Sequence, residues 1–268
     1  MAADADARGN TTIGTADDPV LETTGLLKRF GELVAVDDVS LRIPRGEVRS
    51  VIGPNGAGKT TLFDLITGVL SPTEGAVRFA GADVTGLAPH ERVARGMSRS
   101  FQLTDVFGGL TVRENVRLAA QAARDDGFSP ADWLLRPAGS FDDVLADAEA
   151  VLEQVDLTDR ADERAAALAY GDRRRLEIGI VLATDPDLVL LDEPTAGMSR
   201  EETAATMDLV GDVLADRTLL LIEHDVDLVL DVSDRVTVLD RGSVLASGTP
   251  AEVAADDDVQ AAYLGGSR

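Results

Sequence analysis

A glycine-rich segment with a single lysine gives the clearest chemical signal in the sequence. Gly53-Pro54-Asn55-Gly56-Ala57-Gly58-Lys59-Thr60 fits the phosphate-binding loop pattern at every fixed position. Glycines let backbone N–H groups close around phosphate oxygens, and the start of a following helix adds positive potential. Lys59 would reach the β- and γ-phosphates, Thr60 would bind Mg²⁺, and Thr61 follows as a further nucleotide contact. The alternative is a purely structural glycine-rich turn, which composition disfavours because the chain has only two lysines.

Two adjacent carboxylates follow an apolar run later in the chain. Leu188-Val189-Leu190-Leu191 is followed by Asp192 and Glu193. Asp192 suits the Mg²⁺ shell through a water molecule, and Glu193 would point to an attacking water and act as general base. The alternative is a pair of acids that cap a buried strand. With a phosphate loop in the same chain, the catalytic interpretation is favoured.

Two other polar side chains are candidates for the same chemistry. His224 follows the apolar run Leu219 to Ile222, at a strand end of the kind where α/β sheets place their ligands. It could hydrogen-bond the γ-phosphate and fix the water. Gln102 is a candidate Mg²⁺ or water contact, although its position alone leaves that role undecided. His90 has no such context and is interpreted as a solvated helix start.

The elements that would position these residues follow from periodicity. A strand is predicted at Val48 to Ile52, directly before the glycine-rich loop, and helical spacing follows the loop. The two later apolar runs are typical of buried parallel strands, with a helical stretch between them. Further strands are predicted around Val39 to Ile43 and at Val77 to Ala80. The sequence therefore predicts an α/β fold.

Helical patterns dominate the middle of the chain. Thr111 and Glu114 have the spacing of a capping box, and further helices are predicted at 142–155 and 172–184. Residues 124–142, which include Trp133, are predicted to form an irregular insertion. A hairpin is predicted at 236–246. No internal repeat occurs, so the chain carries one nucleotide-binding unit rather than two.

Acidic residues outnumber basic ones 48 to 25, which gives a formal net charge of −23. Such a surface disfavours nucleic acid or anionic lipid as a partner, because phosphate affinity needs clustered Lys and Arg. An ordinary solvated acidic surface is one interpretation, and adaptation to high salt is the one we favour. The chain has no cysteine, no secretory signal and no apolar run long enough to cross a bilayer, so we expect a cytoplasmic protein.

The ordered set of motifs resembles the ABC ATPase family over about residues 20–265. By this resemblance, Phe101-Gln102 is similar to the Q-loop, Asp192-Glu193-Pro194-Thr195 to the Walker B region, His224 to the switch histidine, and Leu168-Ala169-Tyr170-Gly171-Asp172 to the signature motif. Phe30 is placed like the aromatic residue that stacks on adenine, with a core aromatic as the alternative.

The resemblance implies a P-loop NTPase (RecA-like) core with an antiparallel β subdomain and a helical signature subdomain. Residues 1–19 would be a disordered acidic tail and 20–268 a single ABC ATPase domain. Its helical subdomain would span about 100–180, and a C-terminal extension about 247–268. ATP and Mg²⁺ would bind between two such chains arranged head to tail, with Ala169 and Gly171 of one chain completing the site of the other.

The signature departs from the common Leu-Ser-Gly-Gly-Gln at Ala169, Tyr170 and Asp172. It is similar to one branch, the ATPase subunits of branched-chain amino acid importers. A second departure is Gly197-Met198-Ser199, where many members carry an aspartate that links the two ATP sites. That departure puts communication between the sites in doubt, and not hydrolysis.

Three functions remain open from the sequence. The favoured one is the ATPase of an importer for branched-chain amino acids, or for urea or short amides. It would work at the cytoplasmic face of the membrane with two permease subunits, a companion ATPase or a second copy of itself, and an external solute-binding protein. The others are a soluble ABC ATPase without membrane partners and a P-loop kinase or GTPase. The last leaves the signature and switch histidine unexplained.

Overall fold

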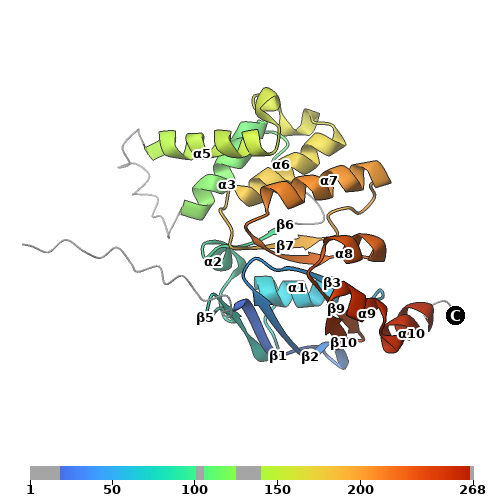
Figure 1. Ribbon diagram of the computed structural model, residues 1–268. Coiled ribbons are helices and arrows are strands. Elements are labelled where there is room, and N and C mark those ends of the chain that lie inside the picture. Colours follow the sequence, from blue (N-terminus) through green and yellow to red (C-terminus); the bar gives the residue numbers. More distant parts are fainter. Residues whose placement is uncertain (1–18, 101–105, 125–139, 266–268) are drawn as a thin grey trace, which may run out of the picture.

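The computed structural model describes residues 19–100, 106–124 and 140–265. Two sheets and surrounding helices form this part of the chain (Figure 1). In spatial order, the antiparallel sheet contains β2 (Leu33–Pro44), β1 (Pro19–Phe30), β4 (Glu74–Phe79) and β5 (Ala82–Asp83). The second, mostly parallel sheet contains β10 (Ser243–Gly248), β9 (Arg235–Asp240), β3 (Val48–Ile52), β8 (Thr218–Ile222), β7 (Leu188–Asp192) and β6 (Met97–Ser100).

The antiparallel sheet follows from alternating apolar residues and short turns. Val39, Leu41 and Ile43 of β2 are buried, as their alternation predicts. Strand β4 covers Glu74 to Phe79 instead of the predicted 77–80. Ala80 has a positive φ of 47° and turns the chain into β5, which explains why the strand ends one residue early. Strand β1 begins at Pro19, one residue inside the predicted tail, and residues 1–18 lie outside the described part.

Strands β7 and β8 are buried along their whole length, so both of their faces contact hydrophobic clusters. Leu188 and Leu190 face one cluster, which contains helix α1 (Lys59–Thr67) and the antiparallel sheet. Val189 and Leu191 face the other, which contains the helical layer. Figure 1 shows the result: α1 lies between the two sheets, and most of the larger helices lie across the parallel sheet.

The helical layer contains α3 (Val112–Arg124), α5 (Ser140–Gln154), α6 (Tyr170–Leu182) and α7 (Arg200–Val213). The predicted capping box is present: Thr111 N–H donates to Glu114 Oε2 at 2.7 Å, and Glu114 N–H donates to Thr111 Oγ1 at 3.1 Å. Helix α6 begins at Tyr170, two residues before the predicted start. Its N-cap is Ala169, whose side chain has no oxygen to accept a hydrogen bond, so the cap signal that marks most helix starts is missing.

Two 3₁₀ helices, η1 (Thr158–Arg160) and η2 (Ala165–Ala167), and four short α-helices complete the described chain. The α-helices are α2 (Pro89–Val93), α8 (Val226–Val232), α9 (Pro250–Ala254) and α10 (Asp257–Gly265). The predicted hairpin at 236–246 is confirmed by antiparallel pairing of β9 with β10. Arg241 and Gly242 both have positive φ, which suits a two-residue hairpin turn. Val229, Val236 and Val253 form a small cluster with the end of β3. Within the described residues, no helix is both long and apolar enough to cross a membrane.

A buried arginine closes the far end of α1. Arg92 is 1% exposed, and its guanidinium donates to the carbonyls of Leu65 at 2.9 Å, Leu87 at 3.2 Å and Thr85 at 3.0 Å, and also to that of Ile66. The last carbonyls of a helix have no partner within it, and a cation there also stabilises the helix dipole. Arg92 thus fixes the C-terminal end of the helix whose N-terminal end carries Lys59.

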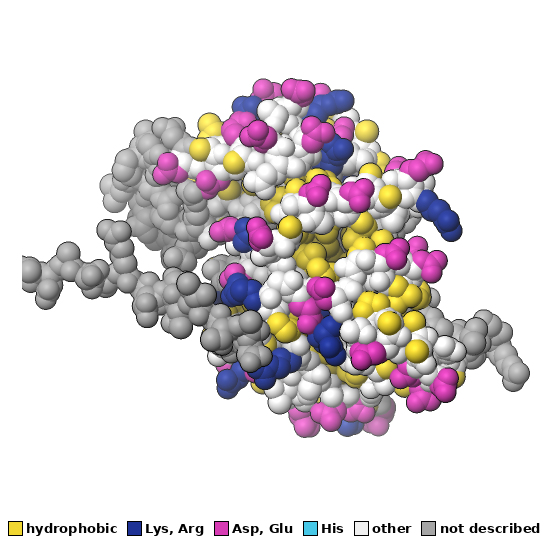
Figure 2. All heavy atoms as spheres, viewed as in Figure 1, with side chains coloured by type: hydrophobic (Ala, Val, Ile, Leu, Met, Phe, Trp, Pro, Cys, Tyr) yellow, Lys and Arg dark blue, Asp and Glu magenta, His cyan; other side chains and the backbone are white. Residues whose placement is uncertain are grey.

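Acidic side chains are spread over the face shown in Figure 2, from the helical layer to the opposite rim, and do not form one patch. Many arginines are used in ion pairs, among them Arg160–Glu163, Arg175–Asp156 and Arg217–Asp185. Exposed pairs of this kind contribute roughly 0–1 kcal/mol each, so they do little for the stability of the fold. Adaptation to high salt stays a prediction.

Replacing Arg92 with Met should destabilise the protein by about 3 kcal/mol or more, since each carbonyl left without a donor costs about 1–3 kcal/mol. Urea unfolding without nucleotide measures the change. Arg160→Met is the matched control, because Arg160 forms an exposed pair, and it should cost about 0.5 kcal/mol or less. Equal losses in the two variants would contradict the structural role of Arg92.

Candidate nucleotide site

The glycine-rich loop lies between the end of β3 and the start of α1, where two of its glycines touch neighbouring strands. A Cβ on Gly53 would lie 2.2 Å from the carbonyl oxygen of Leu239 in β9. A Cβ on Gly58 would lie 2.4 Å from that of Ala35 in β2. These contacts exclude any side chain at either position. The glycines predicted to let backbone approach phosphate therefore also hold the loop against both sheets.

Lys59 is folded onto its own loop. Its Nζ donates to the carbonyl of Gly53 at 2.7 Å and to that of Pro54 at 3.2 Å. Burial lowers the pKa of Lys59, while the nearby charges of Glu193 and Asp192 act in the opposite direction. The structure therefore brings the end of β7 close to the loop, as the sequence predicts. Thr60 is exposed and Thr61 half-buried at the start of α1, with Asn55 and Gly56 exposed in the loop.

Asp192, the last residue of β7, forms an ion pair that the sequence analysis missed. Arg99 of β6 donates to Asp192 Oδ2 at 2.6 Å and to Asp64 Oδ1 of α1 at 2.6 Å. The Arg99 guanidinium also lies 5.7 Å from the centre of the Phe63 ring. A Mg²⁺ ion at Asp192 would share that carboxylate with Arg99. Arg99 stands three residues before Gln102, which was the only available signal.

Glu193 adopts a backbone conformation that is rare for a residue with a side chain, with φ at +47°. Its N–H donates to the carbonyl of Ile222, the last residue of β8, at 2.9 Å. His224 follows β8, and its side chain is 65% exposed. The phosphate loop follows β3, and β8 lies between β3 and β7 in the sheet. Glu193 and His224, which follow β7 and β8, therefore lie on the same side of the sheet as the loop.

Glu223 is the second residue that the sequence analysis passed over. It is fully buried between Ile222 and His224. One of its carboxylate oxygens accepts hydrogen bonds from the N–H and hydroxyl of Thr195, and the other accepts one from the N–H of His224. The only signal was its position directly before His224.

Phe30 ends β1 and is 47% exposed, which excludes the core alternative for this side chain. The ammonium of Lys28 lies 5.1 Å from the centre of its ring and donates to the carbonyl of Ser71 at 2.7 Å. The ring is therefore held at the surface with area free for a planar ligand. Gln102 lies outside the described residues, so its predicted role stays a prediction.

The segment that resembles a signature lies away from the loop. Ala169 and Gly171 are at the start of α6, in the layer on one face of the parallel sheet, whereas α1 lies on the other face (Figure 1). A Cβ on Gly171 would meet no atom within 4 Å, so this backbone is open. A groove of about 250 Å³ runs beside it between α6 and α7 and includes Tyr170 and Met198. One chain alone therefore does not bring Gly171 to its own phosphate loop.

Comparison with known protein families identifies the family of this chain. A family model described as ABC transporter matches residues 36–196. The chain belongs to the ABC transporter ATP-binding family. A second model, described as branched-chain amino acid ATP-binding cassette transporter, matches residues 243–268.

The chain is also similar to individual ABC proteins along nearly their whole length. The chain is 41% identical to the high-affinity branched-chain amino acid transport ATP-binding protein BraF of Pseudomonas aeruginosa, covering 92% of this chain and 98% of BraF. It is 40% identical to LivG of Escherichia coli, described in the same words, over the same shares. An ATP-binding cassette of an ABC transporter in its ADP conformation superposes with a TM-score of 0.79 at 32% identity, covering 92% of this chain and 99% of that one. The predicted fold class and ATPase activity are confirmed.

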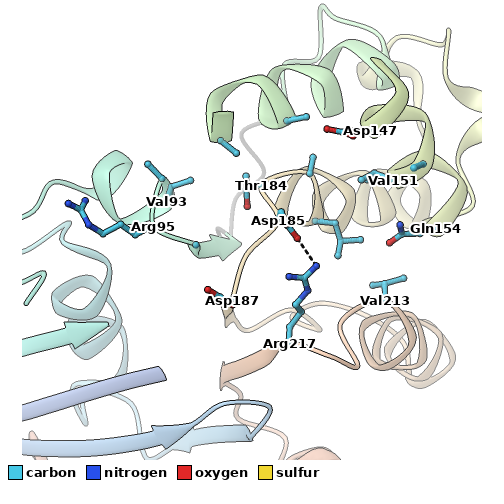
Figure 3. A pocket seen from close by; sticks show the side chains of 17 residues that line it. Val93, Arg95, Asp147, Val151, Gln154, Thr184, Asp185, Asp187, Val213 and Arg217 are labelled. Atoms are coloured by element: carbon cyan, nitrogen blue, oxygen red, sulfur yellow. Dashed lines mark hydrogen bonds and ion pairs between the residues drawn. The ribbon is translucent and has the colours of Figure 1, made fainter. Parts of the chain in front are cut away.

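A cavity of about 640 Å³ lies elsewhere in this ABC ATPase (Figure 3). Its lining includes Gly96, Asp187 and Arg217, which directly precede β6, β7 and β8, with Val151 and Gln154 from α5. Arg217 donates to Asp185 at 2.7 Å within it. The cavity is thus at the amino ends of the parallel strands, whereas the phosphate loop and the carboxylates are at the carboxyl ends. The cavity is therefore not the nucleotide site, although it is large.

Replacing Lys59 with Ala should weaken ATP binding about 10- to 100-fold, since a charge-assisted hydrogen bond contributes about 1.5–3 kcal/mol. Isothermal titration with ATP measures the change. Arg45→Ala is the control, because Arg45 pairs with Asp187 at the opposite end of β7 and should leave affinity unchanged. Unchanged affinity in the Lys59 variant would refute the loop assignment, provided that its unfolding midpoint stays near that of the wild type.

Proposed function

We propose that this chain is the ATP-hydrolysing subunit of an importer for branched-chain amino acids. The observation that carries the proposal is the similarity to BraF and LivG, which spans 98% of each relative, and the branched-chain model separately matches residues 243–268. Urea and short amides are the alternative cargoes. We place the protein at the cytoplasmic face of the membrane, where it would bind two permease subunits, with a solute-binding protein acting indirectly from outside. No nucleic acid takes part.

ATP binding would use three parts of the described site. The loop from Gly53 to Thr60 would surround the phosphates, and Lys59 would exchange its bonds to the loop carbonyls for phosphate oxygens. The exchange gives the buried ammonium of Lys59 a negatively charged phosphate as its partner, which favours binding. Phe30 would stack on the adenine ring, on the area left free by Lys28.

Mg²⁺ would be held by Thr60, Asp192 and the phosphate oxygens, with Gln102 as a further contact. No cage of three or more acidic or histidine side chains occurs among the described residues. The oxygens of Thr60, Asp192 and the phosphates fit Mg²⁺, because this ion is bound through one or two protein oxygens, waters and substrate phosphates. The ion would neutralise charge on the phosphates during hydrolysis.

Hydrolysis would depend on Glu193 and His224. Glu193 would accept a proton from the attacking water, and His224 would orient that water and the γ-phosphate. The exposed His224 ring has room to turn toward the nucleotide. Both residues follow adjacent strands, so a short shift of either changes the geometry of the reacting atoms.

Two chains would complete each site, head to tail, whether the second is a companion ATPase or another copy of this one. The open backbone at Ala169 and Gly171 would face the γ-phosphate held by the partner, and the start of α6 would offer it N–H groups. ATP would then hold the interface together and hydrolysis would release it. The division into a tail (1–19), a helical subdomain (about 100–180) that meets the permeases and a C-terminal extension (about 247–268) stays a prediction.

Glu193→Gln should abolish transport without weakening ATP binding, because the amide cannot accept the proton of the attacking water. The experiment reconstitutes the subunit with its permeases and binding protein, and measures uptake of labelled leucine and release of phosphate. The wild type should couple both, and the variant should accumulate as an ATP-bound dimer. Full turnover by the variant would refute the role of Glu193.

Uptake with labelled urea or acetamide in the same vesicles tests the cargo. Transport of one of these in place of leucine would refute the branched-chain assignment. Phosphate release with no copurifying permease would instead indicate an ATPase without membrane partners.

Gly171→Ala should leave the separate subunit unchanged and reduce ATP hydrolysis by about 10-fold or more. Its Cβ meets nothing within the chain, so folding and ATP binding to the monomer are unaffected. In the dimer it would lie where the partner's γ-phosphate approaches, and a displaced contact at the reacting group has a large kinetic cost. ATP titration, unfolding midpoint and turnover measure the three properties. Wild-type turnover would contradict the composite site.

A further inference from the structure

Glu223 is a carboxylate in the interior of the protein that the proposed mechanism does not use. It is 0% exposed, at the end of the fully buried strand β8. Among the described residues, no arginine or lysine forms an ion pair with it. Burial of a carboxylate is costly unless hydrogen bonds compensate, so its bonds identify what it stabilises.

Those bonds reach the ends of two strands. Oε1 accepts from the N–H of Thr195 at 3.1 Å and from its hydroxyl at 2.6 Å, just beyond the end of β7. Oε2 accepts from the N–H of His224 at 3.2 Å and lies 3.6 Å from the ring Nδ1 of that histidine. One carboxylate therefore joins the turn that contains Glu193 to the residue that contains the switch imidazole.

The turn needs such support. Glu193 holds a positive φ, and strain of this kind costs about 1–3 kcal/mol and persists only where the surroundings enforce it. The chain is fastened to β8 on both sides of the strained Cα. Glu193 N–H is bonded to the carbonyl of Ile222, and Thr195, two residues on, is bonded to Glu223. The strained conformation is thus enforced from a single neighbouring strand end.

We propose that Glu223 is a positioning residue, which holds Glu193 and His224 in a fixed relation while both act on the γ-phosphate. The proposal rests on the proposed ATPase site. Glu223 itself does not reach substrate, because it is fully buried beneath that site. Its effect is on geometry, so it should affect turnover and not nucleotide affinity.

The first variant is Glu223→Gln, which keeps the shape of the side chain. Its amide oxygen can still accept from Thr195, but its NH₂ group then faces the N–H of His224, so that one link is replaced by two opposed donors. We expect kcat to fall about 10- to 100-fold, the scale of a small misplacement of catalytic groups. The KM and Kd for ATP should stay within about twofold of the wild type, because no ground-state contact is lost.

Thr195 offers a matched pair from the other side. Thr195→Ser keeps the hydroxyl that bonds Glu223 and should retain kcat, whereas Thr195→Val removes it and should lower kcat. The double variant that combines Thr195→Val with Glu223→Gln should lose less kcat than the product of the fold losses of the two single variants. Both substitutions act through one hydrogen-bonded unit. Steady-state hydrolysis, ATP titration and unfolding midpoints measure all four variants.

Wild-type kcat in Glu223→Gln would overturn the proposal. So would a parallel loss of kcat, ATP affinity and unfolding midpoint, which would indicate a structural role only. Should Glu223→Gln fail to fold, equal kcat in Thr195→Ser and Thr195→Val would overturn it. Glu193→Gln, measured alongside, separates failure of the proposed ATPase site from failure of the role of Glu223. If Glu193→Gln still hydrolyses ATP, the proposed site is wrong. If Glu193→Gln is inactive while Glu223→Gln keeps wild-type kcat, only the role of Glu223 is wrong.

Discussion

The close approach of the phosphate loop to two strands is the constraint on which the other contacts of the site depend. Gly53 touches the backbone of β9 and Gly58 that of β2, in each case at a distance that leaves no room for a Cβ. The N–H of Gly242 donates to the carbonyl of Ala57, and its own carbonyl accepts from Asp37 N–H. The β9–β10 turn therefore joins the loop to the antiparallel sheet. With the loop fixed at both ends, Lys59 projects to one place, and Arg92 secures the other end of the same helix.

A second fixed point lies opposite, where β7 and β8 end. Asp192 is held by Arg99, which also reaches Asp64 in α1. The helix that begins with Lys59 is thereby tied to the strand that carries the Mg²⁺ candidate. The opposing effects on the pKa of Lys59 follow from this arrangement: burial favours the neutral amine, and the two carboxylates favour the ammonium. An anionic ligand beside Lys59 would act in the same direction as the carboxylates and favour the ammonium further.

Period and motif were enough to predict the central strands and the α/β class, whereas the roles of the candidate site residues stay predictions. The runs at 188–191 and 219–222 are strands because uninterrupted apolar residues bury both faces, which the structure confirms. The start of α6 was placed two residues late because Ala169 gives no cap signal. Arg99 and Glu223 were missed for a different reason: each acts through a partner far away in sequence, Asp192 and Thr195, and no local pattern encodes that contact.

The segment from Pro194 to Ala196 is where the strand ends meet the helical layer. Arg174 of α6 donates to the carbonyl of Pro194, and the hydroxyl of Tyr170 donates to that of Ala196 at 3.4 Å. Thr195, between them, is bonded to Glu223. Three consecutive residues therefore connect the start of α6, the end of β8 and the strained Glu193. The aspartate that many family members carry is absent from Gly197-Met198-Ser199. The helix that would face the partner's nucleotide is nevertheless joined to the turn that contains Glu193, through hydrogen bonds to the carbonyls of Pro194 and Ala196.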